Sequence, residues 1–138
     1  MIATLPNNTS GMRLFMAHTL AIPPCCPVSR NPLAGSTFTI CYRARVDVLE
    51  VYSLKAYIRD FVGGYRGVTG EIEIRTMEGM IARVAADCAS AVGVPVRVKA
   101  EVLLRPQQSM TVIARCYPER ETVYTPNVEP CVTASPSD

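Results

Sequence analysis

The fold is decided by the stretch MEGMIARVAADCASAV at residues 77–92. Its apolar residues recur at helical spacing and are Met77, Met80, Ile81, Val84, Ala85 and Cys88. Such spacing is typical of a helix with one buried face. Gly93 follows directly, and glycine is the residue that most often ends a helix. The sequence therefore predicts one long amphipathic helix, with the other elements arranged around it.

Outward from this helix, the pattern predicts a second helix and four strands. Residues 50–62 place Val51, Leu54, Ile58 and Phe61 at helical spacing. Alternating or β-branched runs predict strands over 13–22, 37–48, 94–104 and 109–116, and residues 71–74 a short extended piece. The order strand, strand, helix, helix, strand, strand favours an α+β fold with an antiparallel sheet and helices on one face. Its exposed strand edges favour edge-to-edge assembly.

Length and composition indicate one domain. The chain has 138 residues, of which 49% are hydrophobic and 19% charged, and this excludes wholesale disorder. We expect a domain over residues 12–117, a flexible N-terminus over 1–11 and a proline-rich tail over 118–138. A net charge of +2 does not by itself indicate a nucleic-acid binder. The arginines fit a phosphate-contacting face and plain solvent exposure equally well, and in the first 46 residues they are Arg13, Arg30, Arg43 and Arg45.

Six cysteines raise the question of metal or disulfide chemistry. Their spacing includes no C-x-x-C pair, so no metal site is expected. We expect Cys41, Cys88 and Cys116 to be small buried side chains in a reducing compartment. No stretch has the length of a transmembrane helix, and residues 14–22 lack a signal-peptide cleavage site. The expected location is the cytoplasm, without a membrane.

Two features are unusual for a purely structural domain. Cys25 and Cys26 begin the run Cys-Cys-Pro-Val-Ser in a proline-rich loop over residues 23–35, where a thiol is more accessible than in a core. Glu78 lies in the first turn of the otherwise apolar helix. A helix dipole favours a carboxylate there, so this residue has a structural interpretation as well.

These residues resemble a known family. The run CPVS at 26–29, the stretch EVYSLKAY at 50–57 and the helix opening Met77-Glu78 are similar to the nitrile-processing members of the tunnelling-fold superfamily. These members are 7-cyano-7-deazaguanine reductase and its shorter relative, the amidine-forming archaeosine synthase. The resemblance covers residues 13–117. It implies a tunnelling fold of order ββααββ that assembles into a homo-oligomeric barrel.

The resemblance also implies roles for three residues, and a fourth, His18, is considered because it is the only histidine and lies on the strand that leads into the cysteine loop. Cys26 matches the cysteine that attacks the nitrile carbon and forms a covalent thioimide, a reaction suited to a thiolate. Glu78 matches the glutamate that binds the guanine-like edge of the base through its two oxygens. Ser53 contacts substrate or caps its helix. His18 is a proton shuttle or a structural strand residue.

Two neighbours qualify the assignment of the nucleophile. Cys25 is a weaker rival nucleophile next to the matched cysteine. Arg30, four residues beyond Cys26, would lower the pKa of that thiol if its side chain lay near the sulfur.

Three departures from the family pattern point to the amidine-forming branch. Leu33 stands where the family has a proton-moving aspartate, and Met77 stands where it has a histidine. Tyr52 replaces the lysine associated with the nicotinamide cofactor. We therefore expect no cofactor, with ammonia or another amine displacing the thiol.

Alternatives remain open at this point. The deazaguanine base is free, in tRNA or in DNA, and a viral source is compatible with the resemblance. A nicotinamide-dependent nitrile reductase is one alternative function. A base-binding protein that has lost turnover is another. A metal-dependent cyclohydrolase is disfavoured because the chain has one histidine and no paired cysteine spacing.

Overall fold

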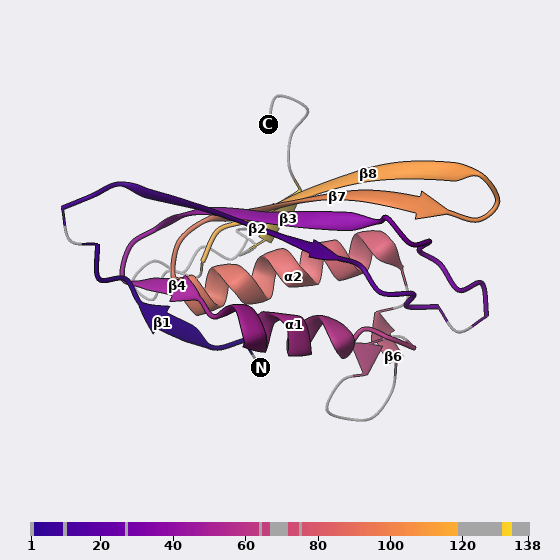
Figure 1. Cartoon of the computed structure of the whole chain (residues 1–138), viewed down its shortest axis with the longest axis horizontal. Coiled ribbons are helices and arrows are strands. Elements are labelled where there is room, and N and C mark those ends of the chain that lie inside the picture. Colours follow the sequence, from indigo (N-terminus) through magenta and orange to yellow (C-terminus); the bar gives the residue numbers. More distant parts are fainter. Residues whose placement is uncertain are drawn as a thin grey trace, which may run out of the picture.

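The structure is a computed structural model that describes residues 2–9, 11–26, 28–63, 65–66, 72–74, 76–118 and 131–133. Two helices pack against one face of an antiparallel sheet (Figure 1). The long elements are β2 (Leu14–Ala21), β3 (Thr37–Ala44), α1 (Val51–Arg59), α2 (Met77–Val92), β7 (Val96–Leu104) and β8 (Gln108–Cys116). This order and the α+β class are those predicted from the sequence.

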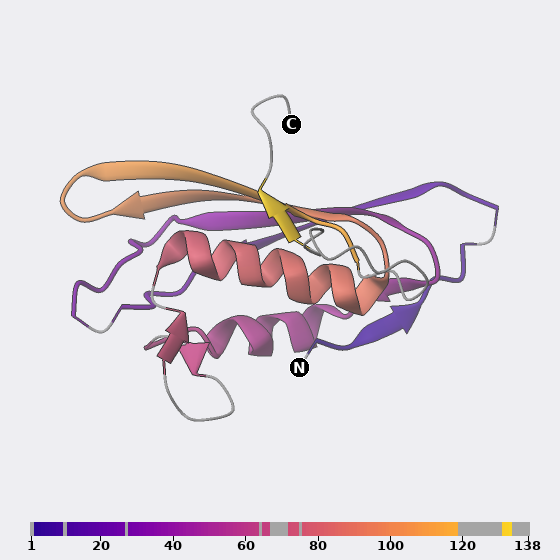
Figure 2. The ribbon, with the colours of Figure 1, turned by 180° about the vertical axis from the view of Figure 1, so that it is seen from behind.

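The main sheet has the strand order β2-β3-β7-β8-β9, where β9 is Cys131–Thr133. Two hairpins, β2–β3 and β7–β8, are joined by antiparallel pairing of β3 with β7. Both helices are inserted between the hairpins in the chain and lie on the same side of the sheet (Figure 2). β2 therefore forms one edge of the five-stranded sheet.

Four short strands form two separate two-stranded ladders. β1 (Thr4–Pro6) pairs with β4 (Asp47–Leu49), and β5 (Tyr65–Arg66) pairs with β6 (Ile72–Ile74). The predicted strand over 37–48 is thus two strands, because the chain bends at residues 45–46 and β4 pairs with β1.

Both ends of the chain contribute strands where the sequence suggested irregular structure. β1 lies within the expected flexible N-terminus, and β9 lies within the expected proline-rich tail and pairs with β8. Residues 119–130 and 134–138 of that tail are outside the described residues.

The ends of α2 coincide with the prediction because both are defined by local capping. The Thr76 hydroxyl accepts a hydrogen bond from the Gly79 N–H at 3.1 Å, which satisfies one of the unpaired donors of the first turn. A Cβ on Gly79 would lie 2.9 Å from that hydroxyl. At the other end Gly93 has a φ of 70°, the left-handed conformation that glycine adopts without strain.

The core lies between the sheet and the helices. Inward residues of β3 and β7 alternate with outward ones, as the period of two requires, and share one hydrophobic core with the apolar faces of the helices. The large side chains among them with no exposed surface include Phe38, Ile40, Val96, Val98, Ile81 and Val84. α1 is shorter than predicted and ends at Arg59, followed by a turn through residue 63.

The three cysteines expected in the core do not behave alike. Cys88 and Cys116 are buried, as predicted. Cys41 is only partly buried, because it alternates with the inward residues of β3 and lies on the face of the sheet that the helices do not cover.

Candidate functional site

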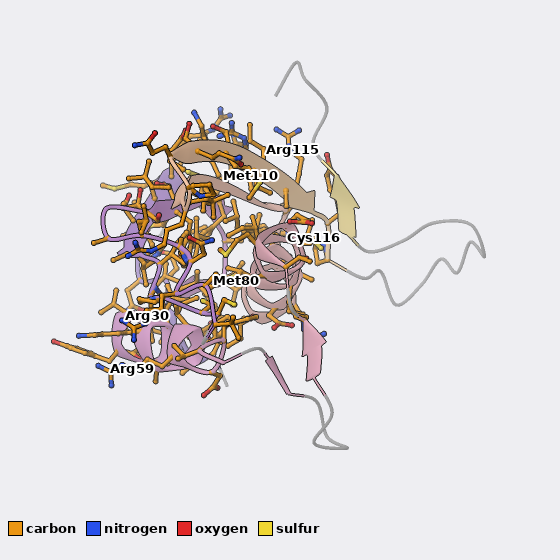
Figure 3. All side chains as sticks on the ribbon, turned by 90° about the vertical axis from the view of Figure 1, so that its right-hand side faces the viewer. Arg30, Arg59, Met80, Met110, Arg115 and Cys116 are labelled. Carbon is orange, nitrogen blue, oxygen red and sulfur yellow. The ribbon has the colours of Figure 1, made fainter. Side chains whose placement is uncertain are left out.

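The cysteine-containing loop joins β2 to β3 and lies at the end of the molecule where α1 ends and α2 begins (Figure 1). The Gly63 N–H, just after α1, donates a hydrogen bond of 2.6 Å to the carbonyl oxygen of Cys25. The Cys25 sulfur lies 3.9 Å from the sulfur of Met80 in the first turns of α2. Figure 3 views this end, with Arg30 of the loop and Met80 labelled. The loop is therefore packed against both helices.

Cys26 lies in a tight turn whose main-chain donors face its sulfur. The Ser29 N–H donates to Cys26 Sγ at 3.4 Å, and the Arg30 N–H donates to the Cys26 carbonyl oxygen at 2.9 Å. Arg30 has a φ of 58°, which folds the backbone back over the turn. Hydrogen bonds from Ser29, by side chain and backbone, followed by backbone bonds from Val28, lower the pKa of the Cys26 thiol.

Cys25 has the opposite environment. Its thiol donates to the Pro23 carbonyl oxygen at 3.1 Å and is packed against Met80. Burial, followed by the nearby Cys26 charge, raises the pKa of Cys25 to about 11. Because the thiolate is the nucleophilic form, these environments favour Cys26 over Cys25 as the reactive thiol.

Asn31 connects the loop to a distant hairpin. Its carbonyl oxygen accepts hydrogen bonds from the N–H groups of Cys25 at 2.9 Å and Cys26 at 3.0 Å. Its side-chain oxygen accepts from the N–H of Arg105 at 2.7 Å, and its side-chain amide donates to the Arg105 carbonyl oxygen at 3.5 Å. Arg105 begins the turn between β7 and β8, so one residue closes the cysteine loop and holds it on the sheet.

Glu78 belongs to the same end of the molecule as the loop but leaves α2 in another direction. It is exposed in the first turn of α2. Met80, two residues later, is buried against Cys25. Two helical residues correspond to a rotation of about 200°. Within one chain the Glu78 side chain therefore starts from the side of α2 opposite the loop.

Ser53 lies at the opposite end of α1 from the cysteine loop. Its N–H donates to the Glu50 carboxylate at 2.6 Å, and its hydroxyl donates to the Glu50 carbonyl oxygen at 3.0 Å. The hydroxyl also accepts from the Ala3 N–H at 2.9 Å. The nine residues of α1 span about 13 Å, so Ser53 and Cys26 of one chain lie at different ends of the helical layer. These hydrogen bonds cap α1 and attach the N-terminal segment.

His18 forms a pair with Tyr42 inside the β2–β3 hairpin. Its Nε2 lies 3.0 Å from the Tyr42 hydroxyl, and the two rings stack with centroids 5.7 Å apart. That hydroxyl also accepts from the Leu49 N–H at 2.9 Å. Burial lowers the pKa of His18, which favours the neutral ring. His18 is about 13 Å along the strand from Ile22, where the loop begins.

An apolar groove opens between the edge strand β2 and α1, beside the start of the cysteine loop. It has a volume of about 460 Å³, within the range of small-molecule sites. Its lining residues are Leu20, Ala21, Pro23, Val51, Tyr52, Lys55, Ile58 and Arg59. Tyr52 is 82% exposed, so its ring is available to stack on a flat ligand.

Leu33 and Met77, which stand where the resembled family has an aspartate and a histidine, both make structural contacts. The Leu33 N–H donates to the Leu103 carbonyl oxygen at 2.8 Å, and Met77 is partly buried against the core. Within the described ranges no three His, Cys, Asp or Glu side chains are grouped closely enough to hold a metal ion. No helix among them is long and apolar enough to cross a membrane.

Sequence reasoning found the thiol but missed the residues that determine its environment. Ser29 was part of the recognised run without a role, and Asn31 was not singled out. The spacing Cys-x-x-Ser is a local signal for a turn that returns to the sulfur. The contacts of Asn31 with Arg105 and of Cys25 with Met80 have no local signal, because they join residues 74 and 55 positions apart.

Comparison with known proteins gives no family assignment, because no family model and no curated protein matches the chain.

Proposed function

We propose that this protein converts the nitrile of a 7-cyano-7-deazaguanine base to an amidine, with Cys26 as the nucleophile. The observation that supports this most directly is the turn around Cys26, where hydrogen bonds lower the pKa of an accessible thiol. A thiolate that is exposed to solvent at neutral pH can react with an electrophilic carbon. The choice of a nitrile as the electrophile comes from the order of the motifs, which resembles that of the nitrile-processing family.

The reaction balances without a cofactor. The Cys26 thiolate adds to the nitrile carbon, forming a carbon–sulfur bond, and the nitrile nitrogen takes a proton to give a neutral thioimide. Ammonia then adds to the same carbon. The carbon–sulfur bond breaks, and the sulfur leaves as thiolate while the adduct loses a proton to give the amidine. No electrons are gained or lost overall, so no hydride donor is required.

Solvent is the proposed proton carrier. The matched aspartate and histidine positions hold Leu33 and Met77, neither of which titrates. His18 was the remaining candidate, but it is hydrogen-bonded to Tyr42 and lies in the strand before the loop. The partial exposure of Cys26 gives water direct access to the reacting atoms.

Base binding is proposed to involve a second copy of the chain. The tunnelling fold and oligomeric barrel that the resemblance implies fit the ββααββ order and the edge position of β2. The groove beside β2 has apolar walls and room for a purine-like ring. Because Glu78 starts from the side of α2 opposite its own loop, its carboxylate is proposed to hold a base that a neighbouring Cys26 attacks. Whether that base is free or within tRNA or DNA does not alter this chemistry.

Intact-mass measurement with free 7-cyano-7-deazaguanine, without any amine, tests the proposal. We expect the wild-type mass to increase by the full mass of the substrate, because addition expels no atoms. Cys26→Ala should show no adduct. Cys25→Ala is the matched control and should keep it. An unmodified wild-type protein, or an adduct that persists in Cys26→Ala, contradicts the proposal.

The two alternative functions predict different results with the same substrate. A nitrile reductase would consume a reduced nicotinamide cofactor when substrate is added, which absorbance would detect. A base-binding protein without turnover is favoured by the lost aspartate and histidine. It would bind the base in a manner that depends on Glu78 and not on Cys26, and would form neither adduct nor amidine.

A further inference from the structure

Ser29 makes two kinds of contact within the cysteine turn. Its N–H points at Cys26 Sγ at 3.4 Å, and its hydroxyl oxygen accepts from the Asn31 N–H at 3.3 Å. A serine hydroxyl has one proton to donate as well as lone pairs to accept. The contact with Asn31 keeps Ser29 in the turn with its N–H directed at the sulfur, and hydrogen bonding by Ser29 lowers the pKa of the Cys26 thiol.

The position of Ser29 is fixed from outside the turn. Asn31 accepts from Cys26 N–H at 3.0 Å and binds both main-chain groups of Arg105. The first of these contacts closes the turn, and the second holds it on the β7–β8 hairpin. The turn therefore cannot open without breaking hydrogen bonds to a different part of the sheet.

We propose that Ser29 is a positioning residue, which keeps its N–H directed at the Cys26 sulfur and so favours the thiolate form, in a turn that Asn31 clamps to the β7–β8 hairpin. The role rests on the proposed function, since it prepares the nucleophile of that reaction. In this role the hydrogen bond from Ser29 stabilises the sulfur anion in place of a neighbouring positive charge. The Ser29 N–H stabilises the sulfur anion, because hydrogen bonds to a charged acceptor are about twice as strong as neutral ones.

Charged groups near the turn do not account for the same effect. The titratable side chains of the loop itself, besides Cys26, are Cys25 and Arg30. Those of α1, α2 and the turns packed against the loop are Tyr52, Lys55, Tyr57, Arg59, Asp60, Glu78, Arg83, Asp87, Cys88 and Arg105. None of these side chains is among the causes of the lowered pKa of Cys26, where Arg30 contributes only through its backbone. The expectation that the Arg30 side chain lowers this pKa is therefore replaced by a role for the turn itself.

The test is the pH dependence of Cys26 alkylation by iodoacetamide, read at the single residue by fragment-ion mass spectrometry. The midpoint for wild type should lie below that of an ordinary thiol. Ser29→Ala should raise the midpoint and slow alkylation at neutral pH severalfold, because the turn that holds the donor on the sulfur is loosened. Ser29→Thr, which keeps the hydroxyl, should restore it. Ser109→Ala, at an exposed serine in β8, is the matched control and should leave the midpoint unchanged.

A purely structural role of Ser29 would change stability without moving this midpoint. An unchanged midpoint in folded Ser29→Ala, or a wild-type midpoint at the ordinary value, overturns the proposal. If Ser29→Ala does not fold, Asn31→Ala provides the second reading. It keeps the serine but removes the clamp to Arg105, and the midpoint should rise; an unchanged midpoint would again contradict the proposal.

The assay needs no nitrile, so its result is separable from that of the proposed function. A shifted midpoint without a substrate adduct would leave the role of Ser29 intact and reject the nitrile chemistry. A substrate adduct together with an unshifted midpoint would support the nitrile chemistry and reject the role of Ser29.

Discussion

Cys25 and Cys26 are identical residues at adjacent positions, yet the fold gives them opposite properties. The Cys25 thiol is packed between Pro23 and Met80, and burial raises its pKa to about 11. The Cys26 thiol lies in a turn of donors that lowers its pKa. The reactivity of each thiol therefore depends on its surroundings and not on the dipeptide, and three experiments test this difference.

The largest expected effect is the difference in alkylation rate between the two thiols. At pH 7 a thiol with a pKa of about 11 is ionised in about one molecule in 10,000. A thiol whose pKa lies below the ordinary 9.0 is ionised in at least about one in 100. A thiolate of higher pKa is the better nucleophile, which offsets about tenfold of this difference. Cys26 should therefore react with iodoacetamide at least about tenfold faster than Cys25, as measured residue by residue in wild type. Equal rates would remove the distinction.

The second test removes the cover over Cys25. Met80 is 2% exposed, and Met80→Ala should lower the free energy of unfolding by about 2 to 3 kcal/mol because it leaves a cavity. Cys25 should then alkylate faster, while Cys26, held by its own turn, should change little. Urea unfolding and residue-resolved alkylation measure the two effects. Met12→Ala, at a methionine that is 73% exposed, should alter neither, and an unchanged Cys25 rate in Met80→Ala would show that Met80 does not shield the thiol.

The smallest expected effect is on stability at high pH. Because burial raises the pKa of Cys25 in the folded chain, the unfolded chain loses this proton first as the pH rises. The contribution to stability is complete below about pH 9 and is lost as the pH approaches 11. For a partly buried thiol we expect a loss of about 1 kcal/mol at pH 10.

Urea unfolding at pH 7 and pH 10 compares wild type with Cys25→Ala, which should lose less stability between the two values. Burial also raises the pKa of Cys88, to about 12, but that residue is present in both proteins and its effect cancels. Equal losses in the two proteins would mean that Cys25 is not the group responsible.

The parts of the fold that were predicted correctly are those encoded locally. The helix over 77–92 has the predicted bounds because Thr76 and Gly93, its two caps, are next to it in the chain. The break between β3 and β4 was not predictable, since it depends on pairing with β1, more than 40 positions earlier. The burial of Cys25 likewise depends on Met80, which is 55 positions away.

The candidate site divides along the same line. An accessible thiol at Cys26 follows from a proline-rich loop, and the turn through Ser29 is short enough to leave a sequence signal. The places of His18 and Ser53 do not follow from their motifs. His18 is hydrogen-bonded to Tyr42 on the neighbouring strand of the hairpin, and the Ser53 hydroxyl accepts a hydrogen bond from Ala3 of the N-terminal segment.

Because Asn31 clamps the cysteine loop to Arg105, the loop should not keep its conformation when it is separated from the rest of the chain. A synthetic peptide of residues 22–36 would contain Cys25, Cys26, the prolines and Ser29 in order. It would lack the partners at Gly63, Met80 and Arg105 that hold the segment in shape. Its two sulfurs would titrate together as ordinary thiols, because the different environments of Cys25 and Cys26 depend on contacts with three remote parts of the chain.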